Sequence, residues 1–113
     1  AVEWSTPEIN KTAVSGYRIV LAHFPDIALT NVKADLIVAG HTHGGQVRLP
    51  FIGPIITLSQ IPRAWAAGLT KLPNGNLLYV SRGIGMERGW APRVRFNCRP
   101  ELAVIDVVPQ EKR

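Results

Sequence analysis

The chain has 113 residues, 46% of them hydrophobic, and a mean hydropathy near zero, which favours one small globular domain over a disordered segment. No apolar run approaches the roughly 20 residues that span a bilayer, and the single cysteine, Cys98, excludes an intrachain disulfide and is expected to pack as a small hydrophobic residue. The net charge of +5 comes from basic residues that form no run and no pattern with stacking aromatics, so nucleic-acid binding is not predicted.

The predicted elements are mostly short strands. Residues 1–15 are polar and are interpreted as a linker or frayed segment, and residues 110–113 as a tail. A short helix is predicted over 26–32, with Asp26 as a candidate N-cap. The dipeptide Asn74-Gly75 predicts a tight hairpin turn. Strands are predicted near 17–22, 36–39, 46–49, 67–71, 77–80 and 102–107.

All three histidines of the chain follow predicted buried strands. His23 comes after the strand at 17–22, while His41 and His43 belong to Gly40-His41-Thr42-His43, directly after the strand at 36–39. Carboxyl ends of strands are where open α/β sheets place their sites, and neutral imidazole is the commonest metal-ligating side chain. In strand-like geometry, alternate side chains point to the same side, which suits two metal ions about 3.5–4 Å apart. Taken singly, a His-x-His pair can also be a chance surface feature, and His23 can be a capped or satisfied histidine that ligates no metal.

These blocks resemble the C-terminal half of a calcineurin-like metallophosphoesterase. The resemblance runs from about Tyr17 to Val107 and rests on His23 before Pro25-Asp26 and on the run from Gly40 to Pro50. Further segments resemble a subgroup of membrane-associated bacterial phosphodiesterases that includes enzymes cleaving the pyrophosphate of UDP-diacylglucosamine; they are 51–54, 66–69, 79–83 and 100–102. The resemblance implies an α/β fold, in which residues 16–109 form the second, mostly β half of an αββα sandwich.

The chain departs from the family pattern in its missing blocks. Such enzymes also carry Asp-x-His, Gly-Asp-x-x-Asp and Gly-Asn-His motifs, and none occurs here; the one Gly-Asn, Gly75-Asn76, is followed by Leu77. Those motifs supply the metal-bridging aspartate, the other carboxylate, the asparagine and the catalytic histidine. We therefore expect a fragment of about half a domain that contains no catalytic residue and is inactive as an isolated chain.

The resemblance also implies a ligand set. His43 would complete one metal site and His23 with His41 the other, in a pair of divalent ions (Mn, Fe or Zn) whose remaining ligands lie in the missing half. Arg82 and Arg48 are the implied substrate contacts. Arg82 belongs to five arginines in the stretch 82–99, whose only acid is Glu87. Planar guanidinium groups suit phosphate; a solvated basic loop is the alternative for each arginine.

The apolar loop from Leu49 to Gly68 has two interpretations. It could hold an acyl chain or lie at a membrane interface, with Trp65 and Arg63 at the head-group level. Alternatively, it packs against the missing half of the domain.

The expected partner is a phosphorylated small molecule or lipid substrate. The face left open in a half domain is expected to cause self-association.

The expected location is cytoplasmic, with the parent protein peripheral to the inner membrane as a further option. The alternative to a phosphodiesterase or pyrophosphohydrolase fragment is a non-catalytic domain that keeps its histidines for metal binding or interaction.

Overall fold

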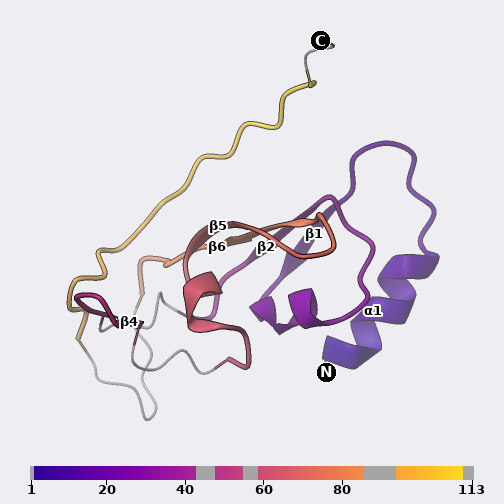
Figure 1. Ribbon diagram of the computed structural model, residues 1–113. Coiled ribbons are helices and arrows are strands. Elements are labelled where there is room, and N and C mark those ends of the chain that lie inside the picture. Colours follow the sequence, from indigo (N-terminus) through magenta and orange to yellow (C-terminus); the bar gives the residue numbers. More distant parts are fainter. Residues whose placement is uncertain (1, 43–47, 55–58, 86–93, 111–113) are drawn as a thin grey trace.

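The computed structural model describes residues 2–42, 48–54, 59–85 and 94–110 (Figure 1). The helical elements are α1 (Val2–Lys11) and the 3₁₀ helices η1 (Pro25–Leu29) and η3 (Arg63–Trp65); the strands are β1 (Ile19–Ala22), β2 (Leu36–Ala39), β3 (Arg48–Leu49), β4 (Gly53–Pro54), β5 (Gly68–Lys71) and β6 (Leu77–Val80). The predicted α/β class is confirmed, with strands predominating as expected for the second half of the sandwich.

Four strands form one mixed sheet in the order β1-β2-β6-β5, and β3 pairs with β4 in a separate two-stranded sheet. β1, β2 and β6 are parallel, while β5 runs antiparallel to β6. The hairpin between β5 and β6 turns where Asn74-Gly75 predicts it, with Gly75 at φ 90° and the Leu72 N–H donating to the Asn76 carbonyl over 2.8 Å. The predicted strands at 17–22, 36–39, 67–71 and 77–80 are therefore present within a few residues of their expected bounds.

The core lies on one face of this sheet. The strand register aligns Val20, Ile37 and Leu78 in one row, and the last two are 0% exposed. Ile27 of η1 packs on this row, together with Val32, Val80 and Leu72. Burial of each large aliphatic side chain contributes about 1.5–3 kcal/mol, so this row determines which face of the sheet is covered. Figure 1 shows the helical segments on one side of the sheet.

The opposite face carries a second apolar row, which we call the outer row: Leu21, Val38, Tyr79 and Leu69. The register places these four residues side by side across all four strands. The two ends of the outer row are open, since Leu21 is 79% and Leu69 65% exposed. The described residues thus cover one face of the sheet and leave much of the other accessible.

The N-terminal segment corrects the expectation of a linker or frayed segment over 1–15. Residues 2–11 are helical, and side-chain contacts join α1 to the turn after η1. The Asn10 amide donates to the Asn31 carbonyl over 2.9 Å and its oxygen accepts the Lys33 N–H over 2.7 Å. The Arg18 guanidinium also donates to the Ile9 carbonyl over 3.0 Å. These contacts are long-range, so local polarity alone could not reveal them. The domain boundary at residue 16 stays a prediction.

Two further expectations change. The helix predicted over 26–32 is a 3₁₀ helix that begins at Pro25, and Asp26 does not cap it. The Asp26 carboxylate instead accepts hydrogen bonds from the Ser59 hydroxyl and, over 3.0 Å, from the Gln60 N–H. The strand predicted at 102–107 is not formed; Leu102 is 90% exposed, and the segment runs away from the body of the molecule (Figure 1). The prediction failed there because a strand needs a neighbour, and none of the described residues pairs with this segment.

Of the predicted strand at 46–49, residues 46 and 47 lie outside the described residues, while Arg48 and Leu49 form β3. No helix in the described ranges is long and apolar enough to cross a membrane.

Candidate metal site at the carboxyl edge of the sheet

Three parallel strands end at the same edge of the sheet, and each is followed by a residue that the sequence analysis selected. His23 follows β1, His41 follows β2 and Arg82 follows β6. Main-chain hydrogen bonds continue past the strands: the Gly40 N–H donates to the His23 carbonyl over 3.3 Å, and the Ser81 N–H donates to the Ala39 carbonyl over 2.8 Å. This edge is the usual site position in sheets with parallel strands.

The structure brings His23 and His41 together. Their ring centroids are 4.9 Å apart, and the ring of Phe24 lies 4.7 Å from His23 and 4.2 Å from His41. With metal–nitrogen bonds of about 2.0–2.1 Å, two imidazoles on one tetrahedral ion have centroids about 5 Å apart. The separation of the two rings is therefore in the range that joint ligation of one divalent ion requires.

The ligand set is incomplete within the described residues. There, no three His, Cys, Asp or Glu side chains cluster so that they could hold a metal ion. His43, the third predicted ligand, lies outside the described residues, and its role stays a prediction. The sequence contains none of the Asp-bearing motifs that the resemblance would require for the remaining ligands.

His41 sits in the left-handed region of backbone space, with φ 68°. Histidine is one of the few non-glycine residues enriched there, yet the conformation still carries a cost. The next residue, Thr42, donates its N–H to the Gly40 carbonyl over 2.8 Å and its hydroxyl to the Ala66 carbonyl over 2.7 Å. The imidazole of His41 is thus presented by a short strained turn that ordered neighbours hold.

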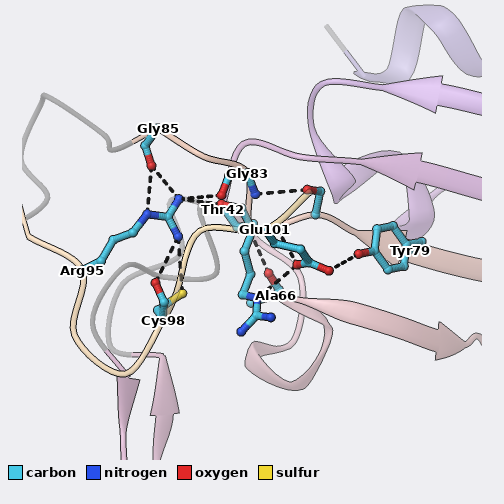
Figure 2. Close-up of polar contacts among 10 residues, drawn as sticks. Thr42, Ala66, Tyr79, Gly83, Gly85, Arg95, Cys98 and Glu101 are labelled. Atoms are coloured by element: carbon cyan, nitrogen blue, oxygen red, sulfur yellow. Dashed lines mark hydrogen bonds and ion pairs between the residues drawn. The ribbon is translucent and has the colours of Figure 1, made fainter. Parts of the chain in front are cut away.

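Arg82 forms an ion pair with Glu101. Its Nε and its backbone N–H donate to one carboxylate oxygen of Glu101, over 3.0 and 3.3 Å, and the Tyr79 hydroxyl donates to the other oxygen (Figure 2). Among the described residues, the terminal nitrogens of the guanidinium have no hydrogen-bond partner, so these remain the donors that could meet an anion. Glu101 was not selected from the sequence, where a lone acid before an apolar segment carries no signal of its partners.

Arg95 has a structural task instead of a binding one. Figure 2 shows its guanidinium directed at backbone carbonyls from two loops. It donates to the carbonyls of Arg82, Gly83 and Gly85, and over 3.2 Å to that of Cys98. Cys98 is 1% exposed, which confirms that it packs in the interior. Part of the basic cluster is therefore committed to holding the loop that carries Arg82.

The remaining predicted residues lie elsewhere. Arg48 is in β3, where its N–H donates to the Phe96 carbonyl over 3.0 Å, and its substrate contact stays a prediction. Trp65 is partly buried and packs against the core cluster, and its placement at a head-group level stays a prediction. The tip of the β3–β4 hairpin is open, with Phe51 fully exposed and Ile52 62% exposed.

No family model and no solved structure matches the chain, but curated sequences do. It is 42% identical over 91 residues to an uncharacterized metallophosphoesterase, YkuE, of Bacillus subtilis, covering 79% of this chain and 30% of that protein. It is 38% identical over 93 residues to the phosphodiesterase YaeI of Escherichia coli, covering 80% and 32%. This chain is homologous to part of a metallophosphoesterase.

A third relative is the UDP-2,3-diacylglucosamine pyrophosphatase LpxG of Chlamydia trachomatis, 38% identical over 95 residues, with 77% of this chain and 28% of that protein covered. The chain thus spans about a third or less of the curated metallophosphoesterases that it matches. The paired imidazoles at the sheet edge are the observation from which a metal-binding role is proposed below.

The Tyr79–Glu101–Arg82 cluster makes stability depend on pH. The hydrogen bond from Tyr79, with a further contribution from Arg82, lowers the pKa of Glu101 below its ordinary 4.5. Burial, followed by the hydrogen bond to Glu101, raises the pKa of Tyr79 to about 12. The stability that Glu101 adds is therefore present above pH 4.5 and lost as pH falls through its lower folded pKa. The stability from neutral Tyr79 is present below pH 10 and lost as pH rises toward 12.

We expect Glu101→Gln to lower the free energy of unfolding at pH 7 by about 1–2 kcal/mol, the size of a hydrogen-bonded charge. The difference from wild type should shrink at pH 3, where the wild-type carboxylate is increasingly protonated. Urea unfolding of both proteins at pH 7 and pH 3 measures this difference in the free energy of unfolding. Glu8→Gln is the control, because Glu8 meets Lys11 over 3.7 Å with both side chains at least 75% exposed, and such pairs add little. An equal loss for Glu101→Gln at both pH values would contradict the assignment.

Proposed function

We propose that the chain supplies the histidine half of the metal site of a dinuclear-metal phosphohydrolase that cleaves phosphodiester or pyrophosphate bonds. The observation that carries the proposal is the proximity of His23 and His41, with ring centroids 4.9 Å apart, in a chain homologous to metallophosphoesterases. His43, two residues after His41, is proposed to face the second ion.

The proposed mechanism assigns a task to each residue. Divalent metal ions, of which Mn, Fe and Zn are the candidates, would supply Lewis-acid activation of the phosphoryl group and of the attacking water when bound. His23 and His41 would hold one of these ions through their imidazole nitrogens. Arg82 orients the phosphoryl group through its terminal guanidinium nitrogens, while Glu101 fixes the inner side of that guanidinium. Arg48 is proposed as a second contact to the substrate.

The proposed substrate is a phosphorylated small molecule or lipid. The named activities of two relatives support this class: one is a phosphodiesterase and another a UDP-2,3-diacylglucosamine pyrophosphatase. A non-catalytic domain that binds metal through its histidines is the second candidate, and the incomplete ligand set among the described residues favours it for the isolated chain.

Activity tests the first candidate. In a longer protein that carries the Asp-x-His and Gly-Asn-His motifs, His41→Ala should abolish hydrolysis of bis-nitrophenyl phosphate, because it removes a ligand from a metal clamp that acts as a unit. Arg82→Ala should slow it on the order of a hundredfold, and Cys98→Ser should leave the rate nearly unchanged.

The 113-residue chain alone should release no nitrophenol above buffer with the same metal. Turnover by this chain that is lost with His41→Ala would show that the missing carboxylates are not needed.

Metal binding tests both candidates. We expect the isolated chain to bind Zn²⁺ and Ni²⁺ weakly, and Mn²⁺ more weakly still, following the usual affinity order. Affinity should fall below neutral pH because protonated imidazole cannot ligate. The measurement is calorimetry of the wild-type chain beside a His41→Ala/His43→Ala variant. Indistinguishable titrations of the two proteins would contradict the assignment of these histidines as metal ligands.

Self-association through the outer row is a further part of the proposal. Two copies related by a twofold axis could bury Leu21 and Leu69 of each against the other. Light scattering at micromolar concentration should detect dimers or larger species, and Leu21→Lys should shift them toward monomer. Leu29→Lys is the matched control, because Leu29 is 49% exposed but lies in η1. A monodisperse wild-type monomer would count against self-association.

A further inference from the structure

Thr42 differs from the other polar residues near the sheet edge because it is buried. It is 3% exposed, and its hydroxyl donates to the Ala66 carbonyl over 2.7 Å (Figure 2). A buried hydroxyl is costly unless it is hydrogen-bonded, so this bond specifies one position for the loop. The bond links two segments that are 24 residues apart in the sequence.

The acceptor of this bond is well anchored. Ala66 is 0% exposed and caps the end of η3, where its own N–H donates to the carbonyl of Arg63, the first residue of that helix. Trp65, immediately before it, packs against the core cluster, and β5 begins two residues later at Gly68. The Ala66 carbonyl is therefore fixed by the core and by the sheet, and it can hold Thr42 in turn.

Between Gly40 and Thr42 lies His41, with φ 68°. A left-handed non-glycine residue costs on the order of 1–3 kcal/mol and persists only when its surroundings impose it. On one side, the Gly40 N–H donates to the His23 carbonyl over 3.3 Å. On the other side, the Thr42 hydroxyl is held by Ala66. Together with the hydrogen bond from the Thr42 N–H to the Gly40 carbonyl over 2.8 Å, these restraints hold the strained turn that places the His41 ring 4.9 Å from that of His23.

We propose that Thr42 is a positioning residue for His41: its buried hydroxyl, held by the Ala66 carbonyl, keeps the His41 imidazole beside His23 and so pre-organises the pair for a divalent ion. This inference rests on the proposed metal-binding function. Residues that orient a metal ligand without touching the metal typically change affinity 10–100-fold when they are replaced. Without the hydroxyl, the turn at His41 relaxes and the pair must be reassembled upon binding.

The test uses the whole chain with Zn²⁺ alone, titrated by calorimetry. Thr42→Val keeps the shape but removes the hydroxyl, and it should raise the Zn²⁺ dissociation constant about tenfold or more. Thr42→Ser keeps the hydroxyl and should bind within about twofold of wild type. Thr30→Val is the control, because the Thr30 hydroxyl also donates to a backbone carbonyl, that of Ile27, over 2.7 Å, and also contacts the Thr6 hydroxyl, at the end of η1 and not in the histidine loop. It should leave the Zn²⁺ affinity unchanged even if it lowers the melting temperature.

A second readout needs no metal. Nuclear Overhauser effects between the ring protons of His23 and His41 should be seen in wild type and in Thr42→Ser, and they should weaken in Thr42→Val. Thr42→Ala replaces Thr42→Val if circular dichroism shows that the latter is unfolded. If both are unfolded, the hydroxyl serves the whole fold, and the positioning role is overturned.

The remaining outcomes separate the two proposals. Wild-type binding that His41→Ala removes, together with unchanged affinity in Thr42→Val, would overturn the role of Thr42 and leave the metal site standing. Equal titrations of wild type and His41→Ala would instead overturn the metal site on which the inference rests. Equal losses in Thr42→Val and Thr30→Val would show that affinity follows general stability, which also overturns the positioning role.

Discussion

The parallel alignment of β1, β2 and β6 is the constraint on which the rest of the structure depends. Their inner apolar positions, among them Val20, Ile37 and Leu78, share one row and one covered face. A slip of one residue would turn this row toward the open face, so burial specifies the register. Once the register is set, all three strands end at one edge. The loops that follow the strands, which carry His23, His41 and Arg82, therefore begin at that edge.

Alignment brings the loops to one edge, but polar contacts determine how their side chains are presented. The histidine loop is fixed by the Thr42–Ala66 hydrogen bond. The loop after β6 is fixed by Arg95, whose guanidinium spans carbonyls from Arg82 to Cys98. These contacts join different segments of the chain. They restrain the loops at the edge in addition to the packing of the apolar row. These hydrogen bonds thus hold the loops that present His41 and Arg82 at the edge.

Sequence reasoning predicted the parts of this arrangement that local pattern determines. Apolar runs located the four sheet strands, and Asn74-Gly75 located the hairpin. The family resemblance implied the pair His23 and His41, whose rings lie 4.9 Å apart, while their ligation of a metal stays a prediction. It failed where partners are remote. The helix at 2–11 depends on contacts such as that of Asn10 with Asn31, and the segment 102–107, which has strand-forming residues, has no strand beside it. The contact between Arg82 and Glu101 was missed for the same reason, because the residues next to each of them in the sequence do not indicate the other as its partner.

The carboxylates near the sheet explain why the chain holds only half of a metal site. Glu101 accepts from Tyr79 and Arg82, and Asp26 accepts from Ser59 and Gln60. Asp35 accepts the Arg18 N–H over 2.7 Å, beside the amino end of β1. Each of these acids therefore already accepts hydrogen bonds within the fold, and for Glu101 and Asp26 moving the carboxylate to a metal would leave a partly buried donor unsatisfied. Two divalent ions bring four positive charges to a chain whose net charge is already +5. Neutral imidazoles do not offset that charge, so a stable dinuclear centre requires carboxylates from outside the described residues.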